Sequence, residues 1–402
     1  MKTILLIDTL WEGHHPTYMK HFAKTLLDLG HEVLAACPDP QGLKKWIHCH
    51  CLDASHRFTS IALHEPEQGR SLSRRLQART ETFARWLQAA KCRQDQTDRW
   101  GKAPDLTFFT WLDSYLGLTD SIVDHIFPYP WSGLFFQPRH ALRPGKSAWL
   151  RRGVLDPLCV LRSSGCSMVA VQDEAVSALL EHRLGKPVVT FPDFTDESPP
   201  DSSYPLIPEI LRKAGDRKII GLLGSLERRK GLLTLLEVAQ QSNRDWFFIF
   251  AGKLAESSFS QEELSRIRRA ITLNPDNCIF HLTPIPTEAQ FNGVVNACDV
   301  IYAAYENFQT SSNLLIKAAI FEKPVIAGEH YCVGERVRRF DLGYTLKEVS
   351  VRQCLLLLQK IREELCHKRL SIHPDFKGFR EQHSIKQLSL SLEALLGLVG
   401  AT

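Results

Sequence analysis

The sequence predicts an α/β protein built from two doubly wound parallel-sheet domains in tandem. Short apolar, β-rich segments alternate with amphipathic helical patterns, which is typical of a parallel sheet covered on both faces. A polar, Pro-rich segment interrupts this alternation near residues 196–217, after which it restarts. The length of 402 residues also exceeds the roughly 250–300 residues at which a single core stops growing.

The first half opens with an apolar strand over residues 4–7 and an amphipathic helix that ends at Gly30, a residue suited to the left-handed backbone at a helix end. The buried face of this helix is expected to carry Tyr18, Phe22, Leu26 and Leu29. Further strands are expected over residues 31–36, 106–110, 132–136, 167–171 and 188–190.

The second half repeats the pattern, with strands expected over residues 219–223, 246–251, 278–282, 300–303 and 324–327. A final helical pattern contains five leucines between residues 388 and 396. We therefore expect a first domain over 1–196, a linker over 197–216, a second domain over 217–375 and a closing helix over 376–402 that packs on the first domain.

The composition is ordinary for a globular protein, with 44% hydrophobic residues, 23% charged residues and a net charge of +4. It excludes collagen-like, low-complexity and wholly disordered chains. No apolar run reaches the roughly 18 residues of a membrane-spanning helix. Residues 1–8 resemble a buried strand rather than a secretory signal because an acid interrupts the apolar run, so we expect a cytoplasmic protein.

The cysteines and one histidine-rich segment raise the question of metal binding. The eleven cysteines are odd in number and mostly scattered among apolar residues, which favours buried thiols. His48, Cys49, His50 and Cys51 alternate, and we expect them at the edge of a strand. A metal site there is disfavoured because no second Cys/His pair lies at a finger-like spacing.

Two loops of the second domain favour anion binding. The segment 220–231 leads from a strand through Arg228, Arg229 and Lys230 to a helix that begins at Gly231. Cations beside a helix N-terminus suit a diphosphate, although charge runs are as often solvated turns. In the second loop, Ser311, Ser312 and Asn313 are good N-cap residues for another helix at the same sheet edge. Simple capping is the alternative for that loop.

The first domain offers polar residues at the corresponding edge. Ligands of such sheets bind outside the carboxyl ends of the strands, and the cleft between two such domains is the expected active site. Gly13 permits close backbone approach, and His14 and His15 can hydrogen-bond sugar hydroxyls or an acceptor. The alternative is a loop histidine packed on a neighbour. Asp113, Arg139 and His140 follow later strands and are further candidates.

Several of these segments resemble the group 1 (family 4) glycosyltransferases. The resemblance rests on Gly224-Ser225-Leu226 with Lys230-Gly231, on 318–327, on Glu335-Arg336-Val337 through Gly343, on Gly13 and 30–33, and on 191–196. It covers nearly the whole chain and implies a GT-B fold, in which two Rossmann-like domains face each other and a C-terminal helix crosses back. It also implies polysaccharide biosynthesis, a nucleotide-sugar donor, no cofactor, no obligatory metal and retention of the anomeric configuration.

By this resemblance, the 1–196 domain binds a hydroxyl acceptor, which is a glycan, a lipid-linked sugar or a small molecule, and the 217–375 domain binds the donor. The chain departs from the family at three positions: Ser225 replaces a diphosphate-binding Arg, and Gln309 and Lys317 replace two glutamates, with Glu306 three residues out of register. The predicted catalytic residues are Lys230, Arg229, His14 and His140. The predicted donor-binding residues are Gly13, Ser225, Lys230, Glu306, Ser311, Ser312, Asn313 and Lys317, and the acceptor-side residues are His15, Asp113 and Arg139.

Two basic segments lie in the first domain, at residues 70–99 and 139–152, each with a net charge of +5. Cations interleaved with Phe83, Trp86 and Trp149 suit peripheral contact with an anionic membrane or a lipid-diphosphate acceptor. Solvated amphipathic helices are an equally good interpretation, and nucleic acid is disfavoured because no recognition module is present.

Two other functions stay open: a catalytically silent GT-B binding subunit and a sugar-nucleotide epimerase. A dinucleotide oxidoreductase is disfavoured because no G-x-G-x-x-G segment follows a predicted strand.

Overall fold

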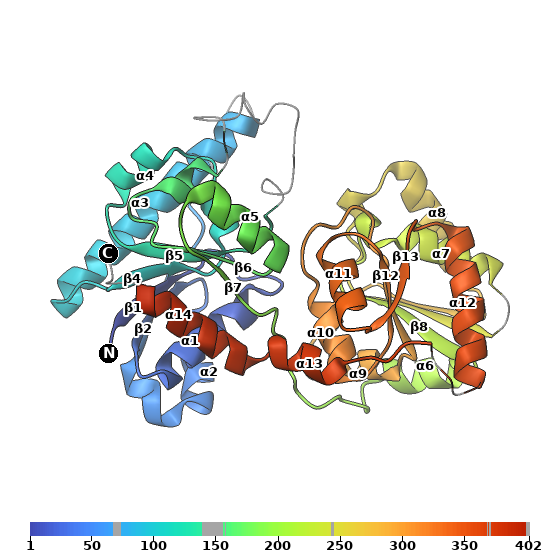
Figure 1. Ribbon diagram of the computed structural model, residues 1–402. Helices are drawn as coiled ribbons and strands as arrows, with labels where there is room; N and C mark the ends of the chain where they lie inside the picture. Colours follow the sequence, from blue (N-terminus) through green and yellow to red (C-terminus); the bar gives the residue numbers. More distant parts are fainter. Residues whose placement is uncertain are drawn as a thin grey trace. The chain divides into compact units, whose positions relative to one another are not determined.

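The computed structural model describes residues 1–66, 74–138, 156, 158–242, 245–367, 369 and 371–398. The chain divides into two compact units. The first unit comprises Met1–Pro192 together with Ser384–Thr402, and the second comprises Asp193–His383. In Figure 1 the red C-terminal helix α14 therefore belongs to the unit that contains the blue elements.

The first unit is built on a seven-stranded sheet in which every pair of neighbours is parallel. The strand order is β3-β2-β1-β4-β5-β6-β7, so the chain order reverses direction beside β1. The five residues of β1 are all buried, as a central strand covered on both faces requires. The strands are β1 (Thr3–Ile7), β2 (Glu32–Cys37), β3 (Phe58–Ala62), β4 (Leu106–Phe109), β5 (Trp131–Phe135), β6 (Val169–Val171) and β7 (Val188–Thr190).

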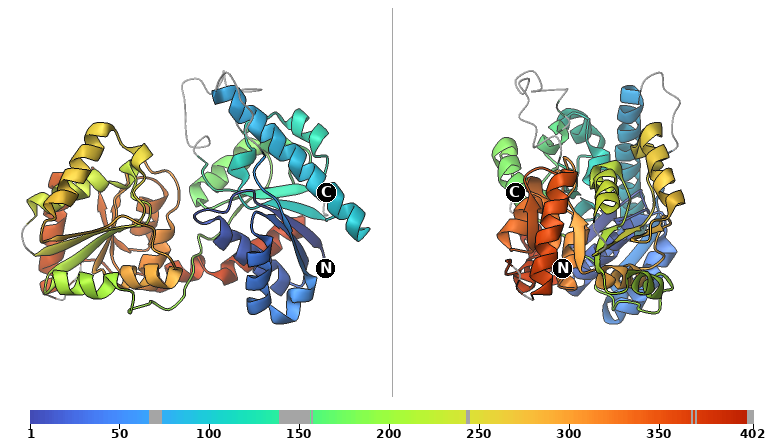
Figure 2. Two further views of the ribbon diagram at one scale, coloured as in Figure 1. Left: turned by 180° about the vertical axis from the view of Figure 1, so that it is seen from behind. Right: turned by 90° about the vertical axis from the view of Figure 1, so that its right-hand side faces the viewer.

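Helices cover both faces of this sheet (Figure 2). Trp86 of α3 is fully buried, with its ring centroid 5.1 Å from that of Trp131 and its Nε1 donating to Tyr115 O at 3.0 Å. The C-terminal helix α14 packs on α1 and β7. The helices are α1 (His15–Asp28), α2 (Pro40–His50), α3 (Arg74–Trp100), α4 (Asp120–Ile126), α5 (Glu174–Leu184) and α14 (Ile385–Leu398), with short 3-10 helices η1 (Leu52–Arg57), η2 (Leu112–Tyr115) and η3 (Cys159–Arg162).

The second unit has a six-stranded parallel sheet in the order β10-β9-β8-β11-β12-β13. All six residues of β9 are buried, and its register places Phe248 opposite Ile220 of β8. The strands are β8 (Lys218–Leu223), β9 (Trp246–Ala251), β10 (Cys278–His281), β11 (Val300–Ala303), β12 (Val325–Gly328) and β13 (Gly343–Leu346).

The helices of the second unit begin with α6, which lies inside the segment that we expected to be a linker. Leu206, Ile207 and Ile210 of α6 are buried in the core of this unit. The helices are α6 (Leu206–Ala214), α7 (Leu232–Gln241), α8 (Gln261–Leu273), α9 (Glu288–Ala297), α10 (Asn313–Ile320), α11 (Tyr331–Arg339), α12 (Val351–Cys366) and α13 (Phe376–Gln382), with η4 (Arg228–Lys230) and η5 (Glu256–Ser258).

The predicted fold class is confirmed. Apart from the segment 48–51, each predicted strand is also confirmed to within two residues at either end. The first helix ends as expected, since Gly30 has φ +87°. The strand predicted at 48–51 is wrong, because these residues close helix α2. Pro40 and the Asp39 side chain, which accepts from Gly42 N at 2.9 Å, start that helix, and Leu43 and Ile47 bury its inner face.

The histidines and cysteines of α2 do not form a metal-binding set. Alternating residues point in nearly opposite directions on a helix, and the His50 ring stacks on Trp46 with a centroid distance of 4.1 Å. No disulfide joins any of the eleven cysteines, all of which lie in the described residues. Nine of them are buried, and only Cys49 and Cys366 are exposed.

Among the helices that the structure describes, none is both long and apolar enough to cross a membrane.

Candidate functional site

The loop from β8 to α7 brings three cations to the carboxyl edge of the second sheet. Gly224 and Gly231 have φ values of +90° and +77°, which favour glycine. Gly231 is also sterically required, because a Cβ there would lie 2.9 Å from Ala304 O. Gly231 is the N-cap residue of α7, so the sequence correctly predicted where this helix begins.

Two of the three cations are held by carboxylates. The Arg228 Nε donates to Glu263 Oε1 at 2.7 Å, and its guanidinium lies 3.7 Å from Glu306 Oε2. The Arg229 Nε donates to Glu227, and its guanidinium carbon lies 4.6 Å from the centre of the Phe308 ring. These contacts fix both arginines within the loop.

Lys230 differs from its two neighbours. Within the described residues its ammonium has no hydrogen-bond or ion-pair partner; it lies against Gly224, where a Cβ would be 3.5 Å from Nζ, and 5.7 Å from the Tyr305 ring centre. Burial lowers the pKa of Lys230 to about 8, with Glu227 acting in the opposite direction and Arg229 in the same one. A half-buried cation without a counter-ion at a helix N-terminus is suited to binding an anion.

The start of α10 lies on the neighbouring strand exit. Ser312 is the N-cap residue, but its side chain makes no capping bond; its Oγ lies 3.2 Å from Tyr305 Oη. The helix therefore begins where the sequence predicted, without the predicted side-chain cap. Its first backbone N–H groups have no partner inside the helix and carry the positive end of the helix dipole.

Ser311 is engaged in a buried polar cluster of the same unit. Its hydroxyl donates to Asp193 and accepts from Arg336 at 2.5 Å. Arg336 and Asp193 lie 3.8 Å apart, with side chains 4% and 1% exposed. His383 completes the cluster by accepting from Asp193 N at 3.0 Å, and burial lowers its pKa to about 2, with the charges of Arg336 and Arg339 acting in the same direction.

Asn313 and Lys317 of α10 also make contacts within the second unit. The Asn313 amide donates to Phe194 O and accepts from Thr195 Oγ1, both at 2.8 Å. The Lys317 ammonium, on a side chain 4% exposed, donates to Asn292 Oδ1 at 2.7 Å and pairs with Glu288 at 2.8 Å. Each of these polar groups therefore has internal partners.

The remaining predicted donor residues of this unit are Ser225 and Glu306. Ser225 is exposed and bonds to Glu227. Glu306 accepts weakly from Thr234 Oγ1 at 3.4 Å, and its backbone N–H donates to Arg229 O at 2.7 Å. The structure thus brings Ser225, Lys230 and Glu306 to one loop cluster around Glu227 and Arg229.

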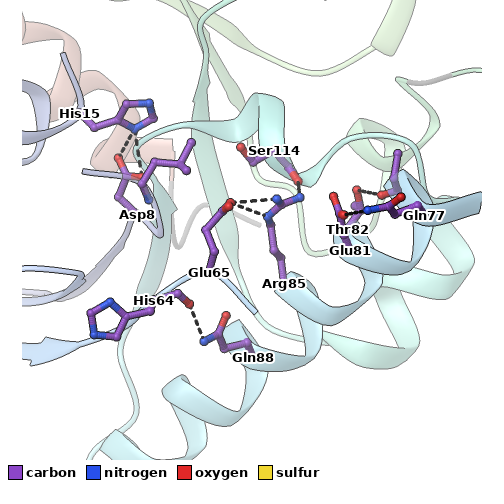
Figure 3. A network of polar contacts seen from close by, with 12 residues as sticks. Asp8, His15, His64, Glu65, Gln77, Glu81, Thr82, Arg85, Gln88 and Ser114 are labelled. Carbon is purple, nitrogen blue, oxygen red and sulfur yellow. Dashed lines mark hydrogen bonds and ion pairs between the residues drawn. The ribbon is translucent and has the colours of Figure 1, made fainter. Parts of the chain in front are cut away.

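The first unit contains a histidine–carboxylate pair at the carboxyl edge of its sheet (Figure 3). Asp8 follows β1, and His15 is the first residue of α1. The His15 Nδ1 lies 2.9 and 3.1 Å from the two Asp8 oxygens. Asp8 also accepts from Thr110 Oγ1 at 2.7 Å and from Leu10 N at 3.0 Å. Asp8 and His15 are 3% and 8% exposed.

Other predicted residues of the first unit have different positions. Gly13 has φ +62°, and His14 is the N-cap residue of α1. The Asp113 carboxylate accepts from the backbone N–H groups of Phe136 and Gln137, both at 2.8 Å, and thereby holds the exit of β5. Arg139 and His140 lie outside the described residues, as does the whole basic segment 139–152.

Sequence reasoning missed Asp8, Thr110, Asp193 and Arg336 as site residues. Asp8 and Thr110 directly follow strands β1 and β4, so their place at the carboxyl edge was a usable signal. The side chains of Asp193 and Arg336 meet only because residues 143 positions apart in the chain fold together, and no local pattern indicates this.

Comparison with known proteins supports the fold. No protein-family model matches the chain, and no curated protein sequence does either. Anabaena HepE, solved with UDP and glucose, has a TM-score of 0.68 at 14% identity over 99% of this chain and 100% of its own. Sucrose-phosphate synthase from Thermosynechococcus elongatus has a TM-score of 0.69 at 15% identity. WaaG, a glycosyltransferase involved in lipopolysaccharide biosynthesis, has a TM-score of 0.62 at 12% identity. Each of these two comparisons covers the whole of both chains. The chain therefore has the GT-B fold.

Proposed function

We propose that this protein is a glycosyltransferase that moves a sugar from a nucleoside diphosphate donor to a hydroxyl acceptor. The observation that carries the proposal is Lys230, whose half-buried ammonium has no counter-ion within the described residues. It stands at the N-terminus of α7, on the sheet edge where α/β folds bind phosphates. The GT-B fold supports the same assignment, as does the structural similarity to HepE, which was solved in complex with UDP-glucose.

The diphosphate would bind between Lys230 and the first turn of α10. Negative charge develops on the leaving diphosphate as its bond to the sugar breaks. A fixed ammonium and fixed backbone N–H groups stabilise that charge without reorganising, which is electrostatic preorganisation. Arg229 would contact the diphosphate once its guanidinium releases Glu227. We expect no metal or other cofactor to be required, so turnover should persist in the presence of EDTA.

The ribose and base would be held differently from the family pattern. Lys317, which the sequence resemblance aligns with the ribose-binding glutamate, has partners on α9. Glu306 is a carboxylate of the Lys230 loop cluster, 3.7 Å from the Arg228 guanidinium, and we propose that it replaces that glutamate. Retention of the anomeric configuration is implied by the sequence resemblance alone.

The acceptor would bind at the first unit. We propose a lipid-linked acceptor and peripheral contact with the inner face of the membrane. This proposal depends on the basic segment 70–99, much of which forms α3. Trp86 is buried and unavailable for such contact, whereas Phe83 and Leu87 are 41% and 47% exposed. Co-sedimentation with anionic vesicles at low salt tests this part of the proposal, and an unchanged supernatant fraction would contradict it.

The experiment for the donor site compares Lys230→Ala with Lys347→Ala, since Lys347 is an exposed lysine of the same unit. Each protein is incubated with a panel of nucleotide sugars that includes UDP-glucose, with and without an acceptor extract, and nucleoside diphosphate release is measured. Loss of one charge-assisted contact of about 1.5–3 kcal/mol lowers turnover by roughly ten-fold or more.

The outcomes separate the three candidate functions. Turnover that falls in Lys230→Ala alone supports the proposal, and equal turnover in the two variants contradicts the role of Lys230. Donor binding without turnover would indicate a silent binding subunit. An isomerised donor without diphosphate release would indicate an epimerase.

A further inference from the structure

We propose that Tyr305 is a positioning residue of the diphosphate site, because it holds both the Lys230 ammonium and the Ser312 hydroxyl in place. This inference rests on the proposed function and adds to it a residue that acts through two others. It uses only contacts within the second unit, where Tyr305 lies just after strand β11 and is 6% exposed.

Ser312 has the residue type and the backbone conformation of a side-chain N-cap but does not act as one. Its φ of −133° and ψ of 113° lie in the extended region, from which a capping side chain accepts from the next backbone N–H groups. Ser260, Thr287 and Ser350, the N-cap residues of α8, α9 and α12 in the same unit, all accept such a bond. The missing bond at Ser312 therefore needs a local cause.

The cause is the hydroxyl of Tyr305. It lies 3.2 Å from Ser312 Oγ, so the two hydroxyls share one hydrogen bond and the serine is turned away from its own helix. Burial raises the pKa of Tyr305 to about 12, so the phenol stays protonated at neutral pH and the bond persists. Within the described residues, the backbone N–H groups of Asn313 and Leu314 have no acceptor, which leaves them open to an anion.

The residues on both sides of Ser312 are fixed by other partners. The Ser311 hydroxyl donates to Asp193, and the Asn313 amide donates to Phe194 O at 2.8 Å. These contacts hold the start of α10 in place while the Ser312 side chain is diverted. The open N–H groups are thus fixed before a ligand arrives, as electrostatic preorganisation requires.

The ring of Tyr305 contacts the other half of the diphosphate site. The Lys230 ammonium lies 5.7 Å from the ring centre, within the distance at which an aromatic face attracts a cation. The ring itself is fixed by an edge-to-face contact with Phe308, with a centroid distance of 4.9 Å. One side chain therefore sets the position of both the ammonium and the open N–H groups.

The test is a double-mutant cycle in the full chain, with nucleoside diphosphate binding measured by calorimetric titration. UDP, GDP and ADP are each titrated into the wild-type protein, and the one that binds most tightly is used for all variants. Tyr305→Phe removes the hydroxyl and keeps the buried ring. Tyr344→Phe is the matched control, because Tyr344 is also 6% exposed and its hydroxyl donates to Glu364 at 2.5 Å.

We expect Tyr305→Phe to weaken binding by about three- to ten-fold, because the released Ser312 hydroxyl caps the first turn of α10 and competes with the anion. In the Ser312→Ala background no hydroxyl competes, so Tyr305→Phe should change the affinity by less than about two-fold. The control variant should bind like the wild type. A residue that only stabilises the loop would weaken binding equally in both backgrounds.

The role of the ring is tested with Tyr305→Leu in the presence and absence of Lys230. Relative to Tyr305→Phe, this variant should weaken binding by a further factor of about three, because the ammonium is no longer held against an aromatic face. In the Lys230→Met background the two Tyr305 variants should bind equally. An additional loss of the same size in both backgrounds would show that the ring only fills space, and would overturn its assigned role.

A Tyr305→Phe variant that binds like the wild type would overturn the inference, as would a loss of affinity that does not depend on the Ser312 hydroxyl. Urea unfolding of each variant separates a loss of binding from a loss of folding. A wild-type protein that binds none of the three nucleoside diphosphates contradicts the proposed function itself. That result differs from an intact wild-type affinity that Tyr305 does not influence.

Discussion

Replacing Lys230 by methionine should stabilise the protein and weaken diphosphate binding at the same time. Burial lowers the pKa of Lys230 to about 8 from 10.5, which corresponds to about 3 kcal/mol against the charged form in the folded state. Because the side chain is half-buried, solvent screening reduces this value. We therefore expect the free energy of unfolding of Lys230→Met to exceed that of the wild-type protein by about 1–2 kcal/mol at pH 7.

The sign of the pH dependence follows from the two pKa values. Below about pH 8, Lys230 is charged in both the folded and the unfolded chain, so the full desolvation cost opposes folding. Between about pH 8 and 10.5 the folded chain releases the proton first, and the stability of the wild-type protein rises relative to that of Lys230→Met. The gap between the two proteins should therefore close as the pH approaches 10.5.

Urea unfolding at pH 7 and pH 10 measures the gap, and calorimetric titration with UDP at pH 7 measures the affinity. Lys347→Met is the control, since Lys347 is exposed. We expect UDP affinity to fall at least ten-fold in Lys230→Met alone, from the loss of about 1.5–3 kcal/mol. A variant that is less stable than the wild type at pH 7, or a gap that is the same at both pH values, would refute the reasoning.

Three further predictions concern the buried polar contacts of the second unit. Asn313→Ala should destabilise that unit by about 1–3 kcal/mol in urea unfolding, because it leaves Phe194 O without its amide donor; an unchanged midpoint would contradict this. Lys317→Met should destabilise the second unit by a similar amount, because Asn292 Oδ1 loses its ammonium donor. This variant should retain most of its UDP affinity, and a large loss of affinity would instead show that Lys317 binds the donor. His383, with a pKa of about 2 against 6.5, must stay neutral in the fold, so stability should fall by about 1.4 kcal/mol per pH unit as the pH drops below 6.5. His383→Asn should flatten that slope, and a parallel slope in the variant would disprove the assignment.

The sequence was sufficient for every central strand and for the edge strands β7 and β10, and insufficient for the other two edge strands. Strands such as β9 are continuous apolar runs because neighbouring strands and helices bury them on every side. The two strands that were missed, β3 and β13, are edge strands whose residues are only partly buried, so their pattern does not differ from that of a loop. Helix α2 was mistaken for a strand because its alternating His and Cys residues concealed the buried pair Leu43 and Ile47.

The candidate site was predictable where it depends on chain order. Lys230, Gly231 and the start of α10 follow from a strand that leads into a helix. Whether each cation has an ion-pair partner was not predictable, because such partners can be distant in the chain. Arg228, for example, is paired with Glu263, a residue 35 positions away. The Asp8–His15 pair spans only seven positions, yet it is recognisable only once a strand end and a helix start are known to adjoin.

The distribution of the cysteines has a practical consequence for spectroscopy. The two exposed thiols lie one in each unit, Cys49 on α2 and Cys366 at the end of α12. Maleimide labels should therefore attach to the native chain at one position per unit, with the nine buried thiols protected while the fold is intact. A donor–acceptor dye pair or two spin labels at these positions would report the separation of the units directly, and its change on addition of a nucleotide sugar, with no engineered cysteine.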